Sequence, residues 1–451
     1  MMHLDLTRTD FTFQYPPFNL LQVKHANILQ EKHPLHVYVH IPYCKTKCRY
    51  CYYKLWAVGE HATDEIDEYL NLLSREIEIV SRAPEVQACG VRSLYIGGGT
   101  PSLLSLDQLA RLFDQLKRSF VFTDNYEICV EANPDEHVLT PEKLSLLKTS
   151  GVTRLSIGVQ SLDDRILKLN GRAGSADEFY RAYEIAKSLG FHAINLDFMS
   201  GMLGENWTNW TRQFDTILSL RPENVSMYKL EFYLNTRLSK QIRQTKRAPG
   251  LLSDEEEAKY AEYAFERLQN EGGYLAKNCY SLTRTEEVAH VHAAGVWDGE
   301  SLLGLGLSAY GLFDGRMYQN TLDLKDYELA ISSGRRPVHR AHLISARERV
   351  ARTMVFGIKK LGISRSKFRE RHGFEMTLLY GDIIRDLIDN GLLIDDGETI
   401  QVPPSKYVYA DDICRAFFLT EHETMMRGHL TRGKIDSLVA ERPSESIAAS
   451  T

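Results

Sequence analysis

The strongest constraint on the fold of this 451-residue chain is an alternation of two hydrophobic periods between residues 35 and 230. Short apolar runs of strand length alternate with longer segments in which apolar residues recur every three or four positions, as in a helix. The predicted strands are 36–41, 93–96, 127–131, 154–158, 193–198 and 224–230, and the predicted helices are 64–82, 106–120, 141–150, 176–189 and 207–220. This order predicts an α/β fold with a parallel sheet curled into a partial (β/α)6 barrel.

Three cysteines follow the first predicted strand in the segment VHIPYCKTKCRYCYYKLW, where Cys44, Cys48 and Cys51 have the spacing C-x3-C-x2-C. Thiolates ligate iron-sulfur clusters, and three of them on one loop can hold three irons of a 4Fe-4S cube, which leaves the fourth iron open. A zinc site is the alternative, but structural zinc uses four ligands and the chain has no second C-x2-C pair. The other cysteines are scattered beside apolar segments, as buried thiols often are: Cys89, Cys129, Cys279 and Cys414.

Polar residues follow the next predicted strands at the points where those strands end. The segment GGGTP, residues 97–101, follows the second strand, Glu131 ends the third, Gln160 follows the fourth, and Asp197 lies at the end of the fifth. In parallel sheets, ligands bind at the carboxyl ends of the strands. We therefore expect these residues to share one rim with the cysteines, although each alone could be a turn, a surface carboxylate or a helix cap.

The rest of the chain divides by pattern into flanking regions. Residues 276–335 are predicted to form strands and turns, and residues 344–418 to form a helix, a second helix, a hairpin and a third helix, which is typical of a winged-helix-like module. The predicted organisation is an N-terminal arm at 1–33, the barrel at 34–235, an extension covering the active site at 236–340, the winged-helix-like helical domain at 341–424, and a polar tail at 425–451.

Charge and composition exclude several classes of protein. The net charge of −6 argues against binding to nucleic acid or to an anionic membrane surface, since both require an excess of basic residues. No apolar run has the length of a membrane span, and the N-terminus lacks the apolar core of a signal peptide. Seven cysteines without a regular framework fit a reducing compartment, so we expect a cytoplasmic protein.

Together, the motifs HIPYCKTKCRYC, GGGTPSLL, VEANPD, RLSIGVQSLDDRILKLNGR and INLDFMSGM resemble the radical S-adenosylmethionine (SAM) enzymes of the oxygen-independent coproporphyrinogen III oxidase group. The resemblance implies a 4Fe-4S cluster on the three cysteines whose open iron binds SAM, and reductive cleavage of SAM to a 5′-deoxyadenosyl radical. It also implies residue roles. Backbone amides of Gly98, Gly99 and Thr100 would reach the methionine moiety, Arg172 its carboxylate, Gln160 and Asp197 the ribose hydroxyls, and Glu131 the ammonium, while Tyr38 would lie near the cofactors.

Some members of this group hold a second SAM. The segment LGLGLSAYG corresponds to part of that pocket, and the resemblance places Tyr310 and His292 along it, with Tyr310, Tyr38 and Glu131 as catalytic candidates. A surface or hydrogen-bonded core histidine is the alternative for His292. Coproporphyrinogen oxidases carry a fourth cysteine two residues after the third, where this chain has Tyr53, preceded by Tyr52.

These departures favour the methyltransferase and cyclopropanase branch. Its members move a methyl or methylene group from the second SAM to an sp2 carbon of an aromatic or heteroaromatic substrate. The alternatives are oxidative decarboxylation of a porphyrinogen and heme trafficking, since the segment HVHAAGVW contains histidines that could contact heme iron. The expected partners are a small aromatic or tetrapyrrole substrate and an electron donor such as flavodoxin or ferredoxin, with no nucleic acid and no membrane.

Overall fold

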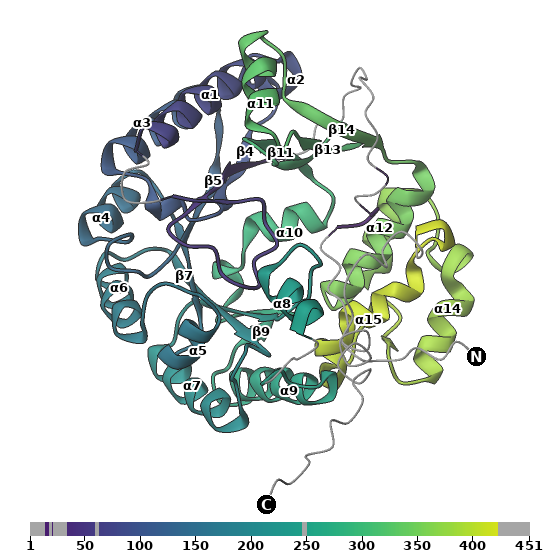
Figure 1. The fold of residues 1–451 in the computed structure, drawn as a ribbon. Helices are drawn as coiled ribbons and strands as arrows, with labels where there is room; N and C mark the ends of the chain where they lie inside the picture. The colour runs from purple at the N-terminus through teal and green to yellow at the C-terminus, as the bar shows by residue number, and fades with distance from the viewer. Residues whose placement is uncertain (1–13, 18–19, 21–33, 59–62, 246–249, 423–451) are drawn as a thin grey trace, which may run out of the picture.

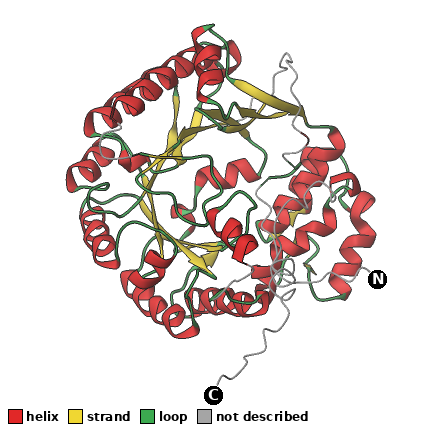
Figure 2. Cartoon of the chain, in the orientation of Figure 1, coloured by secondary structure: helices red, strands yellow, loops and turns green. Residues whose placement is uncertain are grey.

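The computed structural model describes residues 14–17, 20, 34–58, 63–245 and 250–422 (Figure 1). Most of the predicted N-terminal arm and the whole predicted tail at 425–451 lie outside the described residues. The described chain forms a curved sheet ringed by helices, with a second group of helices beside it (Figures 1 and 2). Among the described residues, no helix combines the length and the apolar composition needed to cross a membrane.

A twelve-stranded sheet forms the centre, in the order β14-β13-β12-β11-β1-β4-β5-β6-β7-β8-β10-β9. Its parallel part contains the six predicted strands in chain order and one more, β11, which pairs with β1 in parallel. These strands are β1 (Leu35–Ile41), β4 (Val91–Gly98), β5 (Phe122–Ala132), β6 (Arg154–Gln160), β7 (Ala193–Ser200), β8 (Asn224–Lys229) and β11 (Ser301–Leu305). The antiparallel edges are β12 (Tyr310–Phe313), β13 (Arg316–Asn320) and β14 (Val338–Leu343) on one side, and β9 (Leu275–Ala276) and β10 (Ser281–Thr283) on the other.

Helices follow the strands and cover the outer face of the sheet, so the predicted partial barrel is confirmed (Figure 2). Side-chain caps mark the starts of several of these helices. Thr140 accepts a hydrogen bond from the Lys143 N–H, with Pro141 at the first helical position, and Ser105 forms a capping box with Gln108. The helices of the ring are α1 (Thr63–Ser81), α3 (Leu106–Ser119), α4 (Pro141–Thr149), α5 (Asp164–Leu169), α6 (Ala176–Ser188) and α7 (Trp207–Leu220).

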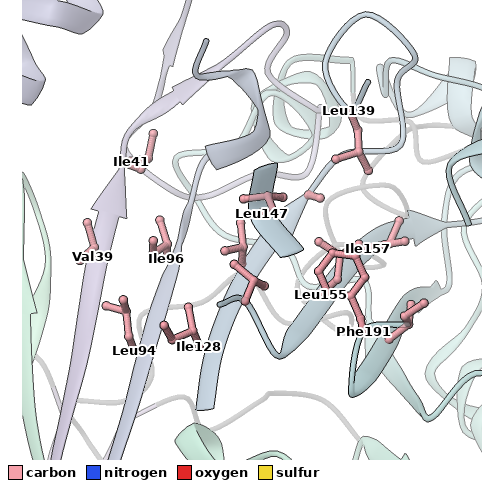
Figure 3. Close-up of a cluster of buried hydrophobic side chains, with 14 of the residues drawn as sticks. Val39, Ile41, Leu94, Ile96, Ile128, Leu139, Leu147, Leu155, Ile157 and Phe191 are labelled. Carbon is pink, nitrogen blue, oxygen red and sulfur yellow. The ribbon is translucent and has the colours of Figure 1, made fainter. Parts of the chain in front are cut away.

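The main hydrophobic core lies between the sheet and these helices. Strands buried on both faces, such as β1 and β6, read as nearly continuous apolar runs, as parallel strands do. In Figure 3, side chains from neighbouring strands and from α4 meet in one cluster that includes Val39, Ile41, Leu94, Ile96, Ile128, Leu147, Leu155 and Ile157. This packing fixes the positions of the strand ends.

The region predicted as strands and turns, 276–335, contains two helices that the pattern did not reveal. The short helix α10 (Val291–Trp297) contacts β1, β4 and β11, and Figure 1 shows it in the middle of the curved sheet. Helix α11 (Leu324–Ser332) is capped by Asp323, whose carboxylate accepts the N–H groups of Lys325 and Asp326. Before this region lie α8 (Arg237–Thr245) and α9 (Asp254–Asn270), and the small elements α2 (Pro84–Gln87), β2 (Tyr43–Cys44) and β3 (Trp56–Ala57) come earlier.

The C-terminal module has its own hydrophobic core and a three-stranded sheet in the order β15-β17-β16. It contains the predicted helices and hairpin, with one additional helix, α13. Its elements are α12 (Ala346–Lys359), β15 (Gly362–Ser364), α13 (Arg365–His372), α14 (Thr377–Asp389), β16 (Ile394–Asp395), β17 (Thr399–Gln401) and α15 (Ala410–Cys414). A buried ion pair between Lys359 and Asp411, 2.6 Å apart, joins α12 to α15.

Candidate functional site

The cysteine segment begins where β1 ends. Cys44 lies in β2, which pairs with β3, so the loop between these two short strands carries Cys48 and Cys51. The Cys51 N–H donates to the Cys48 carbonyl, and all three thiols are free. Within the described residues, no three His, Cys, Asp or Glu side chains converge on a point where a single metal ion could sit. In a 4Fe-4S cube each thiolate bonds a different iron, so its cysteines need not converge in that way.

The chemistry around the thiols fits such a cluster. Burial raises the pKa of Cys44 to about 11 and of Cys51 to about 12, although a hydrogen bond from Thr100 Oγ1 opposes the shift at Cys44. Arg172 Nη1 lies 3.9 Å from Cys48 Sγ. Iron would replace the protons of these thiols, and the nearby guanidinium would offset part of the cluster's negative charge.

Backbone hydrogen bonds join the glycine segment at the end of β4 to the chain that leads into the cysteine loop. The Gly99 and Thr100 N–H groups donate to the carbonyls of Ile41 and Tyr43, and the Gly98 N–H donates to Glu131 Oε2. A Cβ at Gly99 would lie 2.4 Å from the Tyr43 carbonyl oxygen, so only glycine permits this approach. The three amides expected to reach SAM are therefore already engaged within the protein. They position the rim and do not point to a ligand.

Two carboxylates face the interior of this rim, and both have raised pKa values. Burial raises the pKa of Glu131 to about 7, although its oxygens accept from Tyr95 Oη at 2.5 Å and from the Gly98 N–H at 2.9 Å. Burial likewise raises the pKa of Asp197 to about 6, against hydrogen bonds from Asn195 and others. Acids whose ionised forms are destabilised by burial are suited to a cationic ligand, which would stabilise their charge.

Gln160 has a strained backbone and an unsatisfied side chain. It ends β6 with φ +69°, and the β6–β7 register shifts between Gly158 and Gln160. Its Oε1 is buried and has no hydrogen-bond partner among the described residues. The adjacent Arg172 donates through Nη2 to the Gly158 carbonyl. Strain together with an unpartnered acceptor is typical of a ligand site, and here an amide oxygen could accept from a hydroxyl group.

These groups line one cavity of about 420 Å³. It brings together most of the predicted site residues, namely Cys51, Gly99, Thr100, Glu131, Gln160, Arg172 and Asp197. Aromatic side chains form its other wall. The Tyr52 ring stacks on Tyr53 at 4.3 Å and lies 4.2 Å from Tyr233, and Tyr53 is 42% exposed. This wall offers flat, polarisable faces next to the cysteine loop.

Six aromatic residues of the wall were not predicted from the sequence: Tyr50, Tyr95, Tyr228, Tyr233, Tyr280 and Trp297. Tyr95 and Tyr228 lie on predicted strands near their carboxyl ends, so their placement could have been inferred from strand position. The positions of Tyr280 and Trp297 depend on the segment that follows the barrel. Trp297 ends α10, which the sequence pattern did not reveal.

Six predicted site residues do not line this cavity. Gly98, Cys44 and Cys48 belong to the two rim segments beside it, and the other three are Tyr38, Tyr310 and His292. Tyr38 hydrogen-bonds the His40 ring at 2.7 Å and packs behind Tyr95. Tyr310 lies on β12 and bonds Arg340.

His292 lies in a buried network near the amino ends of the strands, the opposite end of the barrel. Its Nδ1 lies 2.7 Å from Ser93 Oγ, its N–H donates to Glu127, and its ring meets His36 edge-on. Burial holds its pKa well below the usual range. His292 is thus a hydrogen-bonded core histidine in this structure and lies outside the lining of the cavity described above.

Comparison with known proteins places this fold and site in a class. The profile of the Radical SAM superfamily matches residues 38–212. Escherichia coli coproporphyrinogen III oxidase (HemN), a radical SAM enzyme, has the same fold, with a TM-score of 0.76 and 22% identity over 91% of this chain and 99% of that one. The chain is also similar to heme chaperone HemW of Bacillus subtilis, with 29% identity over 84% of this chain and 98% of the relative.

HemW of Mycobacterium tuberculosis is 30% identical over 68% of this chain and 76% of the relative. The oxygen-independent coproporphyrinogen III oxidase of Pseudomonas aeruginosa is 27% identical over 85% of each chain. The chain therefore belongs to the radical SAM family of the HemW and HemN, coproporphyrinogen oxidase-like type. The predicted methyltransferase and cyclopropanase branch gains no support from these relatives, whose names match the two alternatives instead.

Proposed function

We propose that this protein is a radical SAM enzyme that directs its radical onto a flat, tetrapyrrole-like substrate. The observation that carries the proposal is the single cavity in which the cysteine loop meets Glu131, Gln160, Arg172 and Asp197. These side chains come from different strands and loops, and a structural metal site would need none of them. A 4Fe-4S cluster held there by Cys44, Cys48 and Cys51 would supply the electron that cleaves bound SAM.

The polar side chains of the cavity match the polar groups of SAM. The Glu131 carboxylate would accept from its ammonium, because a cation offsets the cost of ionising a buried acid. Arg172 donates one N–H group to the Gly158 carbonyl, and its remaining guanidinium N–H groups would bind the carboxylate of SAM. The unpartnered Gln160 Oε1 and the Asp197 carboxylate would accept from its ribose hydroxyls. One SAM would satisfy these groups.

The aromatic wall supports a planar substrate. Beside the cysteine loop, the Tyr52 ring stacks on Tyr53 and contacts the tilted ring of Tyr233. Tyr228, Tyr280 and Trp297 continue the wall. Such rings bind a flat macrocycle through offset stacking and exclude water from the reacting carbon. The names of the relatives refer to heme and to coproporphyrinogen, both of which are tetrapyrroles. We therefore propose a tetrapyrrole as the substrate class.

Heme handling without substrate turnover is the second candidate. The HemW relatives favour it, because this chain covers 98% of the Bacillus protein. Coproporphyrinogen oxidases, which decarboxylate their substrate, have a fourth cysteine at the position of Tyr53. This difference also distinguishes the chain from those enzymes.

The test is an anaerobic assay of the reconstituted full-length protein with dithionite, or with a flavodoxin or ferredoxin as donor, and SAM. We expect 5′-deoxyadenosine, with faster formation when a tetrapyrrole is present. Carbon dioxide from coproporphyrinogen III would identify a decarboxylase, and S-adenosylhomocysteine would identify methyl transfer. Stoichiometric heme binding with transfer to an apo-hemoprotein and no 5′-deoxyadenosine would refute the enzyme proposal and establish the chaperone.

A further inference from the structure

A second cavity, of about 320 Å³, lies between the barrel and the C-terminal module. The end of α10, the β12–β13 turn, α12 and α13 enclose it. Its apolar lining is Trp297, Leu312, Leu343 and Ile344, and its charged lining is Asp298, Asp314, Arg349, Arg352 and Arg371. Trp297 is the residue that it shares with the lining of the candidate SAM cavity, so the two cavities lie on either side of this side chain. Its size suits a small organic molecule.

Arg352 is a buried cation without a described carboxylate partner. It is 5% exposed, and its guanidinium carbon lies 4.3 Å from the Phe356 ring centroid. Nη1 donates to the Tyr15 carbonyl and Nη2 to the Val296 carbonyl, whereas Nε has no acceptor. Burial and the charge of Arg371 lower the pKa of Arg352 to about 9. Two of its five N–H groups therefore have a described acceptor, and no carboxylate of the described residues neutralises its charge.

The two acids of the lining bind other cations. Asp298 Oδ1 accepts from Lys360, and Asp314 lies 3.5 Å from Arg316. Arg349 donates to the Ile344 carbonyl and forms no ion pair with a described carboxylate. The lining thus carries an excess of positive charge around an apolar floor.

Burying an unpaired guanidinium costs several kcal/mol, and such a cost persists in folded proteins chiefly where a ligand compensates it. We propose that this cavity binds an organic carboxylate with an apolar body. Its carboxylate pairs with Arg352 and Arg349, and its body packs on Trp297, Leu312 and Ile344. An inorganic oxyanion shares the charge but leaves the apolar floor uncovered. Because Trp297 also lines the SAM cavity, an occupant touches the wall of the candidate active site.

Isothermal titration of the full-length protein with 3-phenylpropionate, 3-phenylpropanol and inorganic phosphate tests the proposal. We expect one site per chain for 3-phenylpropionate, no binding of the neutral alcohol, and weaker binding of phosphate. Arg352→Gln abolishes binding and Arg349→Gln weakens it about ten- to a hundredfold, the loss expected for one charge-assisted hydrogen bond. Arg385→Gln, an exposed arginine paired with Asp382 on α14, leaves binding unchanged.

Circular dichroism shows whether Arg352→Gln is folded. If it is not, the proposal is judged on Arg349→Gln, since Arg349 lines the cavity but is exposed. No binding of 3-phenylpropionate, or equal binding of the acid and the alcohol, overturns the proposal. Binding that survives both arginine substitutions overturns it as well, because the anion would then lie elsewhere. Tighter binding of phosphate than of 3-phenylpropionate overturns the assignment to an organic ligand.

Discussion

Replacing Glu131 by glutamine should stabilise the unliganded protein while it weakens SAM binding. The carboxyl has a pKa of about 7, against 4.5 for an ordinary glutamate, because the folded protein buries it. The folded state therefore holds its proton more tightly than the unfolded state, so the stability contributed by this group falls as pH rises from 4.5 to 7. Above pH 7 the full cost is about 3 kcal/mol.

Glutamine cannot ionise, so it removes this cost but loses one of the two hydrogen bonds from Tyr95 and Gly98, worth about 1 kcal/mol. We expect Glu131→Gln to raise the free energy of unfolding by about 2 kcal/mol at pH 8 and to leave it nearly unchanged at pH 5, where the cost removed and the hydrogen bond lost are each about 1 kcal/mol. SAM affinity should fall at least about tenfold at pH 8, since the bond between ammonium and carboxylate is lost.

Urea unfolding of the iron-free, reduced protein, followed by tryptophan fluorescence at pH 5 to 8, measures the first effect. Glu266→Gln on the exposed face of α9 is the matched control and should show no difference that depends on pH. Equilibrium dialysis with SAM measures the second effect. A variant that is less stable than the wild type at pH 8, or a difference that stays constant from pH 5 to 8, would show that Glu131 is not a destabilised buried acid.

Three further predictions concern the same rim. Cys48→Ala should abolish both iron retention and SAM cleavage, whereas the half-buried Cys89→Ala should retain both, as iron analysis and 5′-deoxyadenosine assays would show. Arg172→Lys should weaken SAM binding about tenfold in dialysis, because an ammonium cannot form the planar two-point bond; unchanged affinity would argue against carboxylate binding. Gly99→Ala should cost about 2–4 kcal/mol in urea unfolding through a backbone clash, while Gly334→Ala, with no atom within 4 Å of its Cβ, should cost about 1 kcal/mol.

The strand and helix order of the barrel could be predicted because its signals are local. The apolar period placed β6 and β7 with the correct first residue, Arg154 and Ala193, and the helix Trp207–Leu220 with both ends correct. The prediction failed at α10, where HVHAAGVW carries two histidines and a glycine and lacks a clear apolar stripe. That helix is held by β1, β4 and β11, which are distant in sequence, so its conformation depends on tertiary packing.

The sequence by itself determined the class of fold, the cysteine motif and the set of polar residues at the strand ends, because strand order in a parallel sheet brings those ends to one rim. Only the tertiary structure decided how these groups are used. It showed that the amides of the glycine segment bind their own protein, that Glu131 lies buried with a raised pKa, and that Arg352 has no carboxylate partner among the described residues. Such properties arise from contacts between segments up to hundreds of residues apart, which no local pattern specifies.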